Sequence, residues 1–398
     1  MAGRAFATPM GFTYAVLGAG RQGTATAYDF ALHGDADEVR LADLDLKRAR
    51  VAADRVHRLT RKDVARAVRV DVTSRESVLR ALSGIDVFLS AVPYPFNLGI
   101  AKAAVRAKAS MVDLGGHTET ARKQLTLNAQ ARKAGIAIIP ECGMGPGANI
   151  TLAVHAIRML DLAEEVRVYD GGLPQRPRPP WNYELTFNIA GLTNEYTGSA
   201  TFLRGGELVE IPGLSEIEPV EIPPLGPLEA AVTTGGLSTM PWTYRGKLRV
   251  LENKTLRYPG HWARIRGFAD LGLLSDRPVT VRGERVVPRE VFHALFEPQV
   301  TPKEIRDIAV THVVARGRKD GRPAEAVVDM VDRYDEATGF RAMERVTGWH
   351  AAIAAEMIAR REIGPGAHSV ETGIPPERFV EEARDRGFSI KTRVTPLG

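Results

Sequence analysis

The stretch YAVLGAGRQGTATAYDF (Tyr14–Phe30) determines how the N-terminal part of this chain is expected to fold. A short apolar run ends in Gly18, Gly20 and Gly23, and a run of small residues follows. Between a strand and a helix, the first glycine of G-x-G-x-x-G permits the tight turn. The second lets the backbone approach a pyrophosphate, and the third lets the helix pack closely on the strand. The spacing predicts a dinucleotide site at the N-terminus of the first helix.

A carboxylate follows at the distance that such a site requires. The segment LADLD places Asp43 20 residues after Gly23, at the end of a second predicted strand. A carboxylate there can accept hydrogen bonds from the ribose hydroxyls and would repel a 2′-phosphate. Asp45 could share this role, and Lys47 and Arg48 lie close enough to weaken the discrimination. The pattern favours NAD as the cofactor over NADP. The alternative role for Asp43 is that of a solvent-facing cap.

Strand-like and helix-like segments alternate through residues 1–150, which predicts an α/β domain with a doubly wound parallel sheet of the Rossmann type. Ser74 is expected to cap a helix with Glu76 in its first turn. The segment ETARKQLTLNAQARKAG is expected to form a single helix, and ANITLAVHAIRML a linking helix.

Residues 151–340 have a different pattern, which predicts an α+β domain with a mixed, largely antiparallel sheet. Gly205-Gly206 and Asp320-Gly321 each separate two strand-like runs and predict two-residue hairpin turns. The proline-rich segments GGLPQRPRPPWNYELTF and IEPVEIPPLGP are expected to be loops, and residues 341–398 to be helical.

Composition is that of an ordinary soluble globular protein, with 44% apolar and 25% charged residues among 398. The net charge is +5, but the Lys and Arg residues are scattered among acidic residues and do not form runs, so no nucleic-acid partner is expected. The only cysteine is Cys142, which excludes an intramolecular disulfide. No secretion signal and no membrane-spanning run are evident, so we expect a cytoplasmic protein without a membrane partner.

Ligands of such sheets bind beyond the carboxyl ends of the strands. The loops after the fourth, fifth and sixth strands are therefore expected to border the nicotinamide. They hold the catalytic candidates Asp113, His117, Glu141 and Cys142. If the substrate is an amine that is oxidised by hydride transfer, it must first lose its ammonium proton, and His117 or either acid could be the base. The alternatives are a helix cap or loop hydrogen bond for the acids and a small buried filler for Cys142. The other expected cofactor contacts are Arg21, Gln22, Asp71, Val72, Ala91, Val92 and Pro93.

The second domain offers candidates for substrate binding. In TLRYPGHW, Arg257 could bind a carboxylate through both arms of its guanidinium, and His261 follows closely. The alternative for Arg257 is a surface ion pair. Tyr183 and Arg245 are further candidates. Histidines do not occur with metal-ligand spacing, so no metal is expected.

Several blocks of the sequence resemble the saccharopine dehydrogenase-like superfamily, and within it the lysine 6-dehydrogenases. They are VLGAGRQG, CGMGPGANI, GGLPQRPRPPWNYELTF, NEYTGSATFLRGGEL, TTGGLSTMP, TLRYPGH and RVTGWHAAIAAEMI. The resemblance implies that the C-terminal helices pack back on the Rossmann domain and that the chain forms a homodimer or larger oligomer. It also implies an NAD-dependent oxidation of the lysine ε-amine to 2-aminoadipate 6-semialdehyde, which cyclises, with release of ammonia.

Two alternatives remain open on the sequence. The first is saccharopine or another imine-linked amino acid such as a carboxyspermidine. Saccharopine has two more carboxylates than lysine and would need further cations, which Arg176, Arg178 and Arg245 could provide. The other alternative is a protein that binds the nucleotide but catalyses no reaction. With lysine as substrate, Arg257 would bind the α-carboxylate, and Glu141, Tyr183 or Glu195 would contact the α-amine.

Overall fold

The computed structural model describes residues 11–397, which form two compact units. Of these residues, unit 1 contains 11–143 and Thr347–Ile374, and unit 2 contains Met144–Val346 and 375–397. The domain limits expected at residues 150 and 340 stay predictions.

Unit 1 is built on a parallel sheet with the strand order β17-β6-β5-β4-β1-β2-β3. The strands are β1 Phe12–Leu17, β2 Ala36–Asp43, β3 Ala65–Arg69, β4 Val87–Ser90, β5 Ser110–Asp113, β6 Ala137–Ile139 and β17 Gly366–Ala367. The order reverses between β1 and β4, so this is the switch point at which doubly wound sheets bind ligands. The predicted doubly wound sheet is confirmed.

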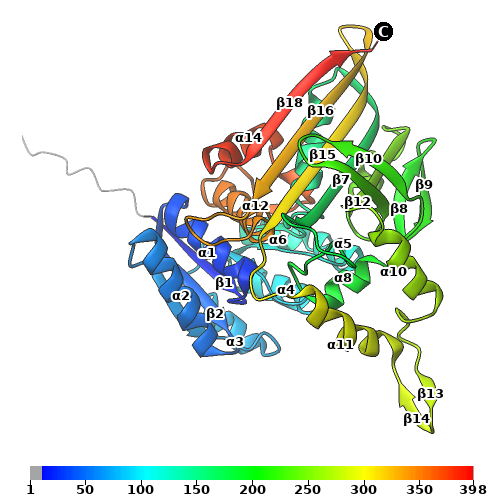
Figure 1. Cartoon of the computed structure of the whole chain (residues 1–398). Coiled ribbons are helices and arrows are strands. Elements are labelled where there is room, and N and C mark those ends of the chain that lie inside the picture. Colours follow the sequence, from blue (N-terminus) through cyan, green and yellow to red (C-terminus); the bar gives the residue numbers. More distant parts are fainter. Residues whose placement is uncertain (1–10, 398) are drawn as a thin grey trace, which may run out of the picture. The chain divides into compact units, whose positions relative to one another are not determined.

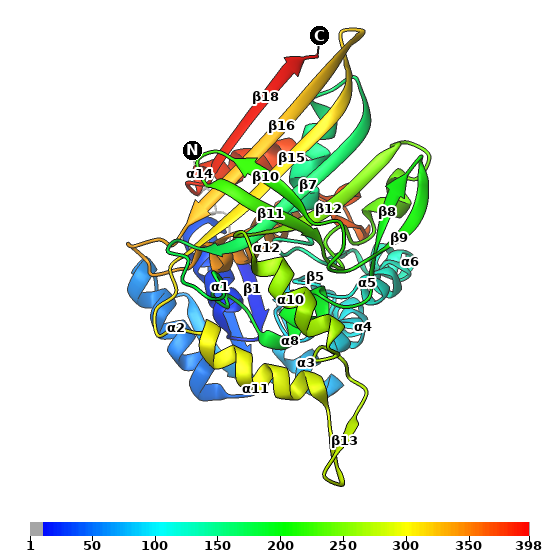
Figure 2. The same ribbon diagram turned by 45° about the vertical axis from the view of Figure 1, so that its right-hand side comes forward.

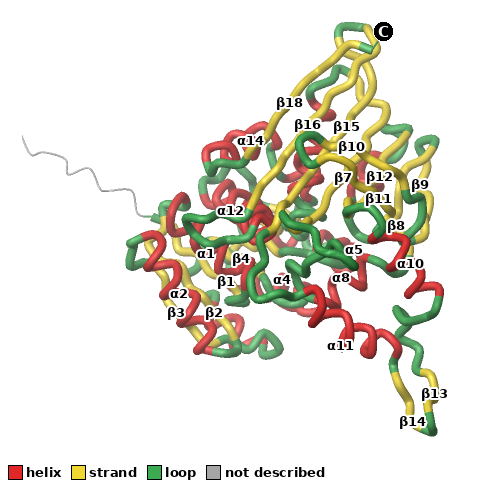
Figure 3. Tube along the Cα trace, viewed as in Figure 1, coloured by secondary structure: helices red, strands yellow, loops and turns green. Residues whose placement is uncertain are grey.

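Helices cover both faces of this sheet, and Figure 3 shows α1 and α2 beside β1–β3. Their bounds are α1 Arg21–His33, α2 Leu46–Thr60, α3 Arg75–Ala81, η1 Tyr94–Phe96, α4 Asn97–Ala107, α5 Thr118–Leu125, α6 Asn128–Ala134 and α13 Val370–Gly373. Ser74 caps α3 by accepting a hydrogen bond from the Ser77 N–H, as expected. The single helix predicted over Glu119–Gly135 is wrong. The chain turns after α5 and buries Leu127 in the core before α6 begins.

The helix α12 (Ala342–Ala359) packs on α1 through its residues in unit 1. Trp349 Nε1 donates to the Ala25 carbonyl over 3.2 Å, and Thr26 Oγ1 donates to the Gly348 carbonyl over 2.9 Å. A Cβ on Gly348 would lie 2.9 Å from the Gln22 carbonyl oxygen, so glycine permits this close approach.

Unit 2 contains a nine-stranded sheet whose main path is β10-β11-β12-β7-β15-β16-β18, with β8 and β9 attached to β12. The strands are β7 Leu162–Pro174, β8 Ser199–Arg204, β9 Glu207–Pro212, β10 Glu218–Ile222, β11 Gly226–Val232, β12 Val250–Arg257, β15 Asp307–Lys319, β16 Arg322–Arg333 and β18 Ser389–Pro396. Only β7 and β12 pair in parallel. The mixed, largely antiparallel sheet is confirmed, and Figure 1 shows the long β15, β16 and β18 side by side.

Both expected two-residue hairpin turns are present. Arg204 pairs with Glu207, and Lys319 with Arg322. The two turn residues have positive φ in each case, 62° and 84° for Gly205-Gly206 and 51° and 73° for Asp320-Gly321. Such turns match the twist of the flanking strands.

Three sequence expectations in unit 2 are wrong. The GGLP of the first expected loop is the end of β7, where Gly171 is packed against Leu256 and has no room for a side chain. The second expected loop contains β10, the turn after it and the start of β11; Pro219 is tolerated because β10 is an edge strand. Residues after 388 form the edge strand β18 rather than helix, and their exposed polar residues hide the strand pattern.

Helices of unit 2 cover its sheet and enclose an aromatic core. They are α7 Ala148–Arg158, α8 Ile189–Glu195, α9 Met240–Tyr244, α10 His261–Asp270, α11 Pro288–Val300 and α14 Pro376–Asp385. The helix α7, the expected linking helix, packs on β7, β15 and β16. The fully buried Trp262 contacts the rings of Tyr196 and His261, and its core cluster also contains Leu192 of α8 and Phe292 and Phe296 of α11. A small hairpin of β13 (Val279–Val281) and β14 (Glu284–Val286) projects beyond α11 (Figure 2).

Candidate functional sites in the two units

The glycine turn after β1 has the three local geometries that a dinucleotide site requires. Gly18 has a φ of 106°, and a Cβ there would lie 2.6 Å from the Ala91 carbonyl oxygen. A Cβ on Gly23 would lie 2.0 Å from the Gly18 carbonyl oxygen, so α1 approaches the turn as closely as only glycine allows. A Cβ on Gly20 would meet no atom within 4 Å. The open position at Gly20, at the start of α1, therefore fits a pyrophosphate.

Asp43 secures this turn from the end of β2. Its Oδ2 accepts a hydrogen bond from the Ala19 N–H and its Oδ1 from the Asp45 N–H, both over 2.9 Å. The cap of α2 is Asp45, whose Oδ1 accepts hydrogen bonds from the Lys47 and Arg48 N–H groups. The half-buried Asp43 is thus held at the edge of the glycine turn, where it can meet a ribose.

The other expected cofactor contacts lie around the same end of the sheet. Ala91 donates its N–H to the Leu17 carbonyl, and the Val92 side chain is 3.3 Å from the Cβ position of Gly18. Arg21 and Gln22 form the first turn of α1, where N–H groups have no intrahelical acceptor. Asp71 is engaged by Thr73, whose hydroxyl holds the pKa of that carboxyl below its usual range. Val72 and Pro93 are the remaining two; Val72 is partly buried and Pro93 is exposed.

Two buried carboxyl groups lie where β5 and β6 end. Asp113 accepts hydrogen bonds from Gln124 Nε2 over 2.7 Å and from the N–H groups of Gly115 and Glu141. Burial raises its pKa against the effect of these donors. Burial, and then the charge of Asp113, raises the pKa of Glu141 to about 8. Glu141 also has a φ of 64°, a conformation that costs energy for a residue with a side chain.

His117 lies on the solvent side of these acids. It caps α5 by accepting the Thr120 N–H on Nδ1, and its ring stacks on Tyr94 with centroids 4.7 Å apart. The His117 and Gly116 N–H groups hydrogen-bond to Glu141. His117 therefore fixes the loop that holds Glu141, and its own side chain is exposed.

Cys142 is fully buried, and its thiol donates to the Ile139 carbonyl over 3.4 Å. Burial raises the pKa of this thiol well above its usual value, so it is held neutral. Two buried residues of the C-terminal segment approach this loop. His350 hydrogen-bonds to the Cys142 backbone, and the charge of Glu371 acts on Glu141. Neither was a candidate from the sequence. His350 lies in the block RVTGWHAAIAAEMI, but a lone histidine among apolar residues gave no separate signal, and Glu371 lies outside the quoted blocks.

The second group of candidates lies in unit 2 around Arg257, the last residue of β12. Arg257 is only 2% exposed, and its guanidinium carbon lies 5.0 Å from the Tyr183 ring centroid and 5.6 Å from that of Trp262. Within the described residues, neither Arg257 Nε nor the Tyr183 hydroxyl has a hydrogen-bond partner. Arg257 is thus a buried cation rather than one half of a surface ion pair.

His261 and Tyr196 complete the inner wall of this cluster. The Tyr196 hydroxyl lies 3.2 Å from His261 Nε2 and is a hydrogen-bond partner of Arg257. Burial, and then the charge of Arg257, lowers the pKa of His261 to about 3. The imidazole is therefore neutral, and Arg257 carries the positive charge of the cluster.

Two acids interact electrostatically with this cation. The sequence suggested Glu195 as a contact for the α-amine, but it did not single out Asp170. Asp170, on β7, accepts a hydrogen bond from Asn149 Nδ2 over 2.8 Å. Glu195 is the last residue of α8 and is partly exposed. Burial raises the pKa of Asp170 to about 6 and that of Glu195 to about 7. Asp170 stands directly before two glycines, a local signal that could have identified it.

Arg245 does not belong to this cluster. Its guanidinium pairs with Glu207 on the surface, and both side chains are more than half exposed. Arg176 and Arg178 are also exposed.

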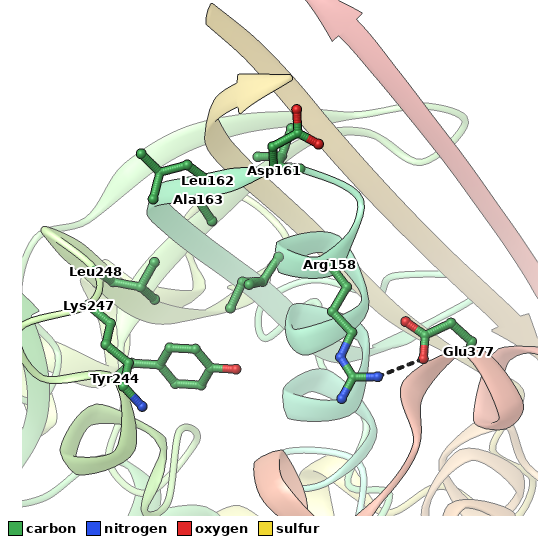
Figure 4. A pocket seen from close by; sticks show the side chains of 10 residues that line it. Arg158, Asp161, Leu162, Ala163, Tyr244, Lys247, Leu248 and Glu377 are labelled. Atoms are coloured by element: carbon green, nitrogen blue, oxygen red, sulfur yellow. Dashed lines mark hydrogen bonds and ion pairs between the residues drawn. The ribbon is translucent and has the colours of Figure 1, made fainter. Parts of the chain in front are cut away.

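A separate cavity of about 620 Å³ lies beside the end of α7 (Figure 4). Arg158 and Glu377 at its wall bind each other over 2.9 Å, and Asp161 is bound by Lys319. None of the site candidates lines this cavity, so we do not assign it to the reaction.

Residues 11–397 contain no cluster of histidine, cysteine and acidic side chains that could hold a metal ion. Over the same residues, no helix has the length and apolar character needed to cross a membrane.

The fold, the switch point and the glycine turn together define a dinucleotide-binding protein with a second, mixed-sheet unit. Residues 14–139 match the saccharopine dehydrogenase NADP binding domain, and residues 143–388 match the saccharopine dehydrogenase C-terminal domain. The chain belongs to the saccharopine dehydrogenase family.

Individual relatives are more distant. The chain is 27% identical over 233 residues to the mitochondrial alpha-aminoadipic semialdehyde synthase of Rattus norvegicus, covering 56% of this chain and 25% of that protein. It is 23% identical over 255 residues to a saccharopine dehydrogenase [NADP(+), L-glutamate-forming] of Saccharomyces cerevisiae, covering 62% of this chain and 56% of the relative. The chain thus spans only a quarter to about half of these curated relatives.

Among solved structures, apo saccharopine dehydrogenase (L-Glu forming) from Saccharomyces cerevisiae superposes with a TM-score of 0.79 at 20% identity. The superposition covers 97% of this chain and 100% of that one. Homospermidine synthase from Legionella pneumophila, in complex with NAD, gives a TM-score of 0.64 at 12% identity, covering 96% and 91%. At these identities the likeness concerns the fold.

Proposed function

We propose that the chain catalyses the NAD-dependent oxidation of the ε-amine of L-lysine. The products would be 2-aminoadipate 6-semialdehyde, which cyclises, and ammonia. Bound NAD would supply the hydride acceptor, held by the glycine turn, the first turn of α1 and Asp43. The preference for NAD rests on Asp43, because a carboxylate at the end of β2 would repel the 2′-phosphate of NADP.

The observation that carries the choice of lysine is the charge of the Arg257 cluster. Arg257 is a buried guanidinium with an N–H group that lacks a partner among the described residues. A carboxylate can accept this hydrogen bond, and the Tyr183 hydroxyl can donate a second one. One cation matches the single carboxylate of lysine. Glu195 and Asp170 interact electrostatically with Arg257, so the cluster has no excess positive charge for a second carboxylate.

The amine must be neutral before a hydride can leave its carbon, so a base is required. We propose Glu141 as this base. Its carboxyl is buried beside Asp113 and its pKa is raised to about 8, so it gains proton affinity suited to an ammonium group. The neighbouring His117 and Gly116 N–H groups would hold the carboxylate in place.

Saccharopine is the second candidate, because the family and the relatives carry that name. It has two more carboxylates than lysine and would need further cations. In unit 2, the arginines that we considered for this purpose are exposed, and Arg245 is paired with Glu207. This favours the smaller substrate.

Formation of NADH tests the proposal directly. The purified chain is mixed with NAD and either L-lysine or saccharopine, and then with NADP in place of NAD. NADH production from lysine alone supports the proposal. Turnover of saccharopine without turnover of lysine would transfer the function to the second candidate. If NAD binds but neither amine reacts, the chain is a nucleotide-binding protein without this activity.

A further inference from the structure

Among the candidates for the α-amine contact, Glu195 is the one that interacts electrostatically with Arg257, as Asp170 also does. We propose that Glu195, supported by Asp170, binds the α-ammonium group of an amino-acid substrate whose α-carboxylate is bound by Arg257. Unit 2 would then recognise the amino-acid head group, leaving the distal amine as the one that is oxidised. This inference rests on the proposed function and extends it to the substrate's head group.

The end of α8 places Glu195 next to the arginine. The next residue, Tyr196, hydrogen-bonds to Arg257 and contacts His261, so the backbone at Glu195 is tied to the buried cation. The charges of Arg257 and Asp170 both act on the Glu195 carboxyl. A cation and an anion that interact in this way match the α-carboxylate and α-ammonium of one amino acid, which are carried by a single carbon.

Asp170 and Glu195 differ in how fully their oxygens are used. Asp170 accepts hydrogen bonds from the side chains of Asn149 and Asn253 and is 7% exposed. Asn149 also donates to the Gly236 carbonyl over 2.9 Å, so Asp170 is part of a fixed polar frame. Glu195, by contrast, is only partly buried, so its side chain is accessible. Glu195 is therefore the acid that can contact a ligand directly, and Asp170 adds negative charge behind it.

The unpartnered groups of the inner wall show that this cluster is built for a polar ligand. Arg257 Nε and the Tyr183 hydroxyl are buried without partners among the described residues, which costs stability unless a ligand or water satisfies them. An ammonium group beside Glu195 would also favour its charged form, which burial disfavours. An amino-acid head group satisfies the donors and the acids together, whereas a simple carboxylate satisfies only the donors.

Three amines distinguish the two halves of the head group. L-lysine has both charged groups, 6-aminohexanoate lacks the α-ammonium, and cadaverine lacks the α-carboxylate. We would measure kcat/KM for each amine at saturating NAD, for the wild type and Glu195→Gln. Glutamine keeps the size of the side chain and removes its charge. Glu221→Gln, an exposed acid of β10, is the matched control for loss of one negative charge.

The wild type is expected to prefer L-lysine over 6-aminohexanoate by roughly 10-fold to 100-fold, the usual range for a charge-assisted hydrogen bond. In Glu195→Gln this preference should fall to less than about 3-fold through loss of lysine activity, while activity on 6-aminohexanoate changes little. Arg257→Lys should instead reduce the preference for lysine over cadaverine. An equal loss on lysine and 6-aminohexanoate in Glu195→Gln would overturn the inference, because a structural role predicts that result.

Ligand-induced thermal stabilisation separates this inference from the proposed function. If the wild type oxidises neither L-lysine nor 6-aminohexanoate, the proposed function fails. Stabilisation by lysine well beyond that by 6-aminohexanoate, lost in Glu195→Gln, would still support a head-group site. If the wild type oxidises lysine but the variant keeps its preference over 6-aminohexanoate, only the head-group inference fails.

Discussion

Replacing Gly20 and Gly23 separately by alanine should distinguish cofactor binding from folding. A Cβ on Gly23 would lie 2.0 Å from the Gly18 carbonyl oxygen and 2.9 Å from Val16 Cγ1, so backbone must move. Overpacking of this kind costs about 3 kcal/mol. At about 2–4 °C per kcal/mol, Tm should fall by roughly 6–12 °C.

Gly20→Ala should behave in the opposite way. Gly20 has φ −75° and ψ −165°, which alanine also adopts, and a Cβ there meets nothing within 4 Å. Because alanine restricts the unfolded chain, the free energy of unfolding should stay constant or increase by up to about 1 kcal/mol. Tm should accordingly stay constant or rise. The new methyl group would occupy the space expected for the pyrophosphate, and NADH affinity should fall at least tenfold, about 1.4 kcal/mol.

The assay is a fluorescence titration with NADH, paired with thermal unfolding of the same samples. Wild-type affinity in Gly20→Ala would refute the assignment of this turn to the pyrophosphate. A large loss of Tm in Gly20→Ala would show that the local geometry around the turn is wrong. Gly23→Ala serves as the control in which a loss of binding accompanies a loss of stability.

Three further predictions concern the acids and one helix cap. Asp43→Asn should lower the ratio of kcat/KM with NAD to that with NADP at least tenfold, because the repulsion of the 2′-phosphate is lost; an unchanged ratio would contradict our account of Asp43. The raised pKa of Glu141, about 8, means that its protonated form stabilises the fold fully below its ordinary value of 4.5, and that this contribution is lost as the pH rises through about 8. Tm should therefore fall over this window in the wild type and fall less in Glu141→Gln, whereas parallel profiles would exclude the shift. Ser74→Ala should cost about 1 kcal/mol in urea unfolding, because α3 loses the hydrogen bond to the Ser77 N–H; no change would show that this cap is unimportant.

The sequence predicted the features whose physics is local. The G-x-G-x-x-G turn, the acid at the end of β2 and the two-residue hairpins each depend on a few neighbouring residues. The parallel sheet followed from alternating strands and helices, because buried strands need helices on both faces. The break between α5 and α6 was missed, because it depends on the burial of Leu127 in the tertiary structure.

The sites depend on contacts between distant segments, and there the sequence was a weaker guide. Arg257 was singled out from its motif, but its facing acids stand 62 and 87 residues earlier in the chain, on α8 and β7. His350 lies in an apolar helix, where a lone histidine gives no signal, yet it contacts the Cys142 backbone. Arg245 carried the right charge for a substrate contact, but its local partner Glu207 holds it at the surface.

The stoichiometry of ammonia release tests the central claim most directly. L-lysine and NAD are incubated with the purified chain, and NADH and ammonia are measured in the same reaction. Our account predicts equal amounts of NADH and ammonia from lysine, with no oxo acid required. Absence of both products from lysine, together with NADH and glutamate formed from saccharopine without ammonia, would contradict it.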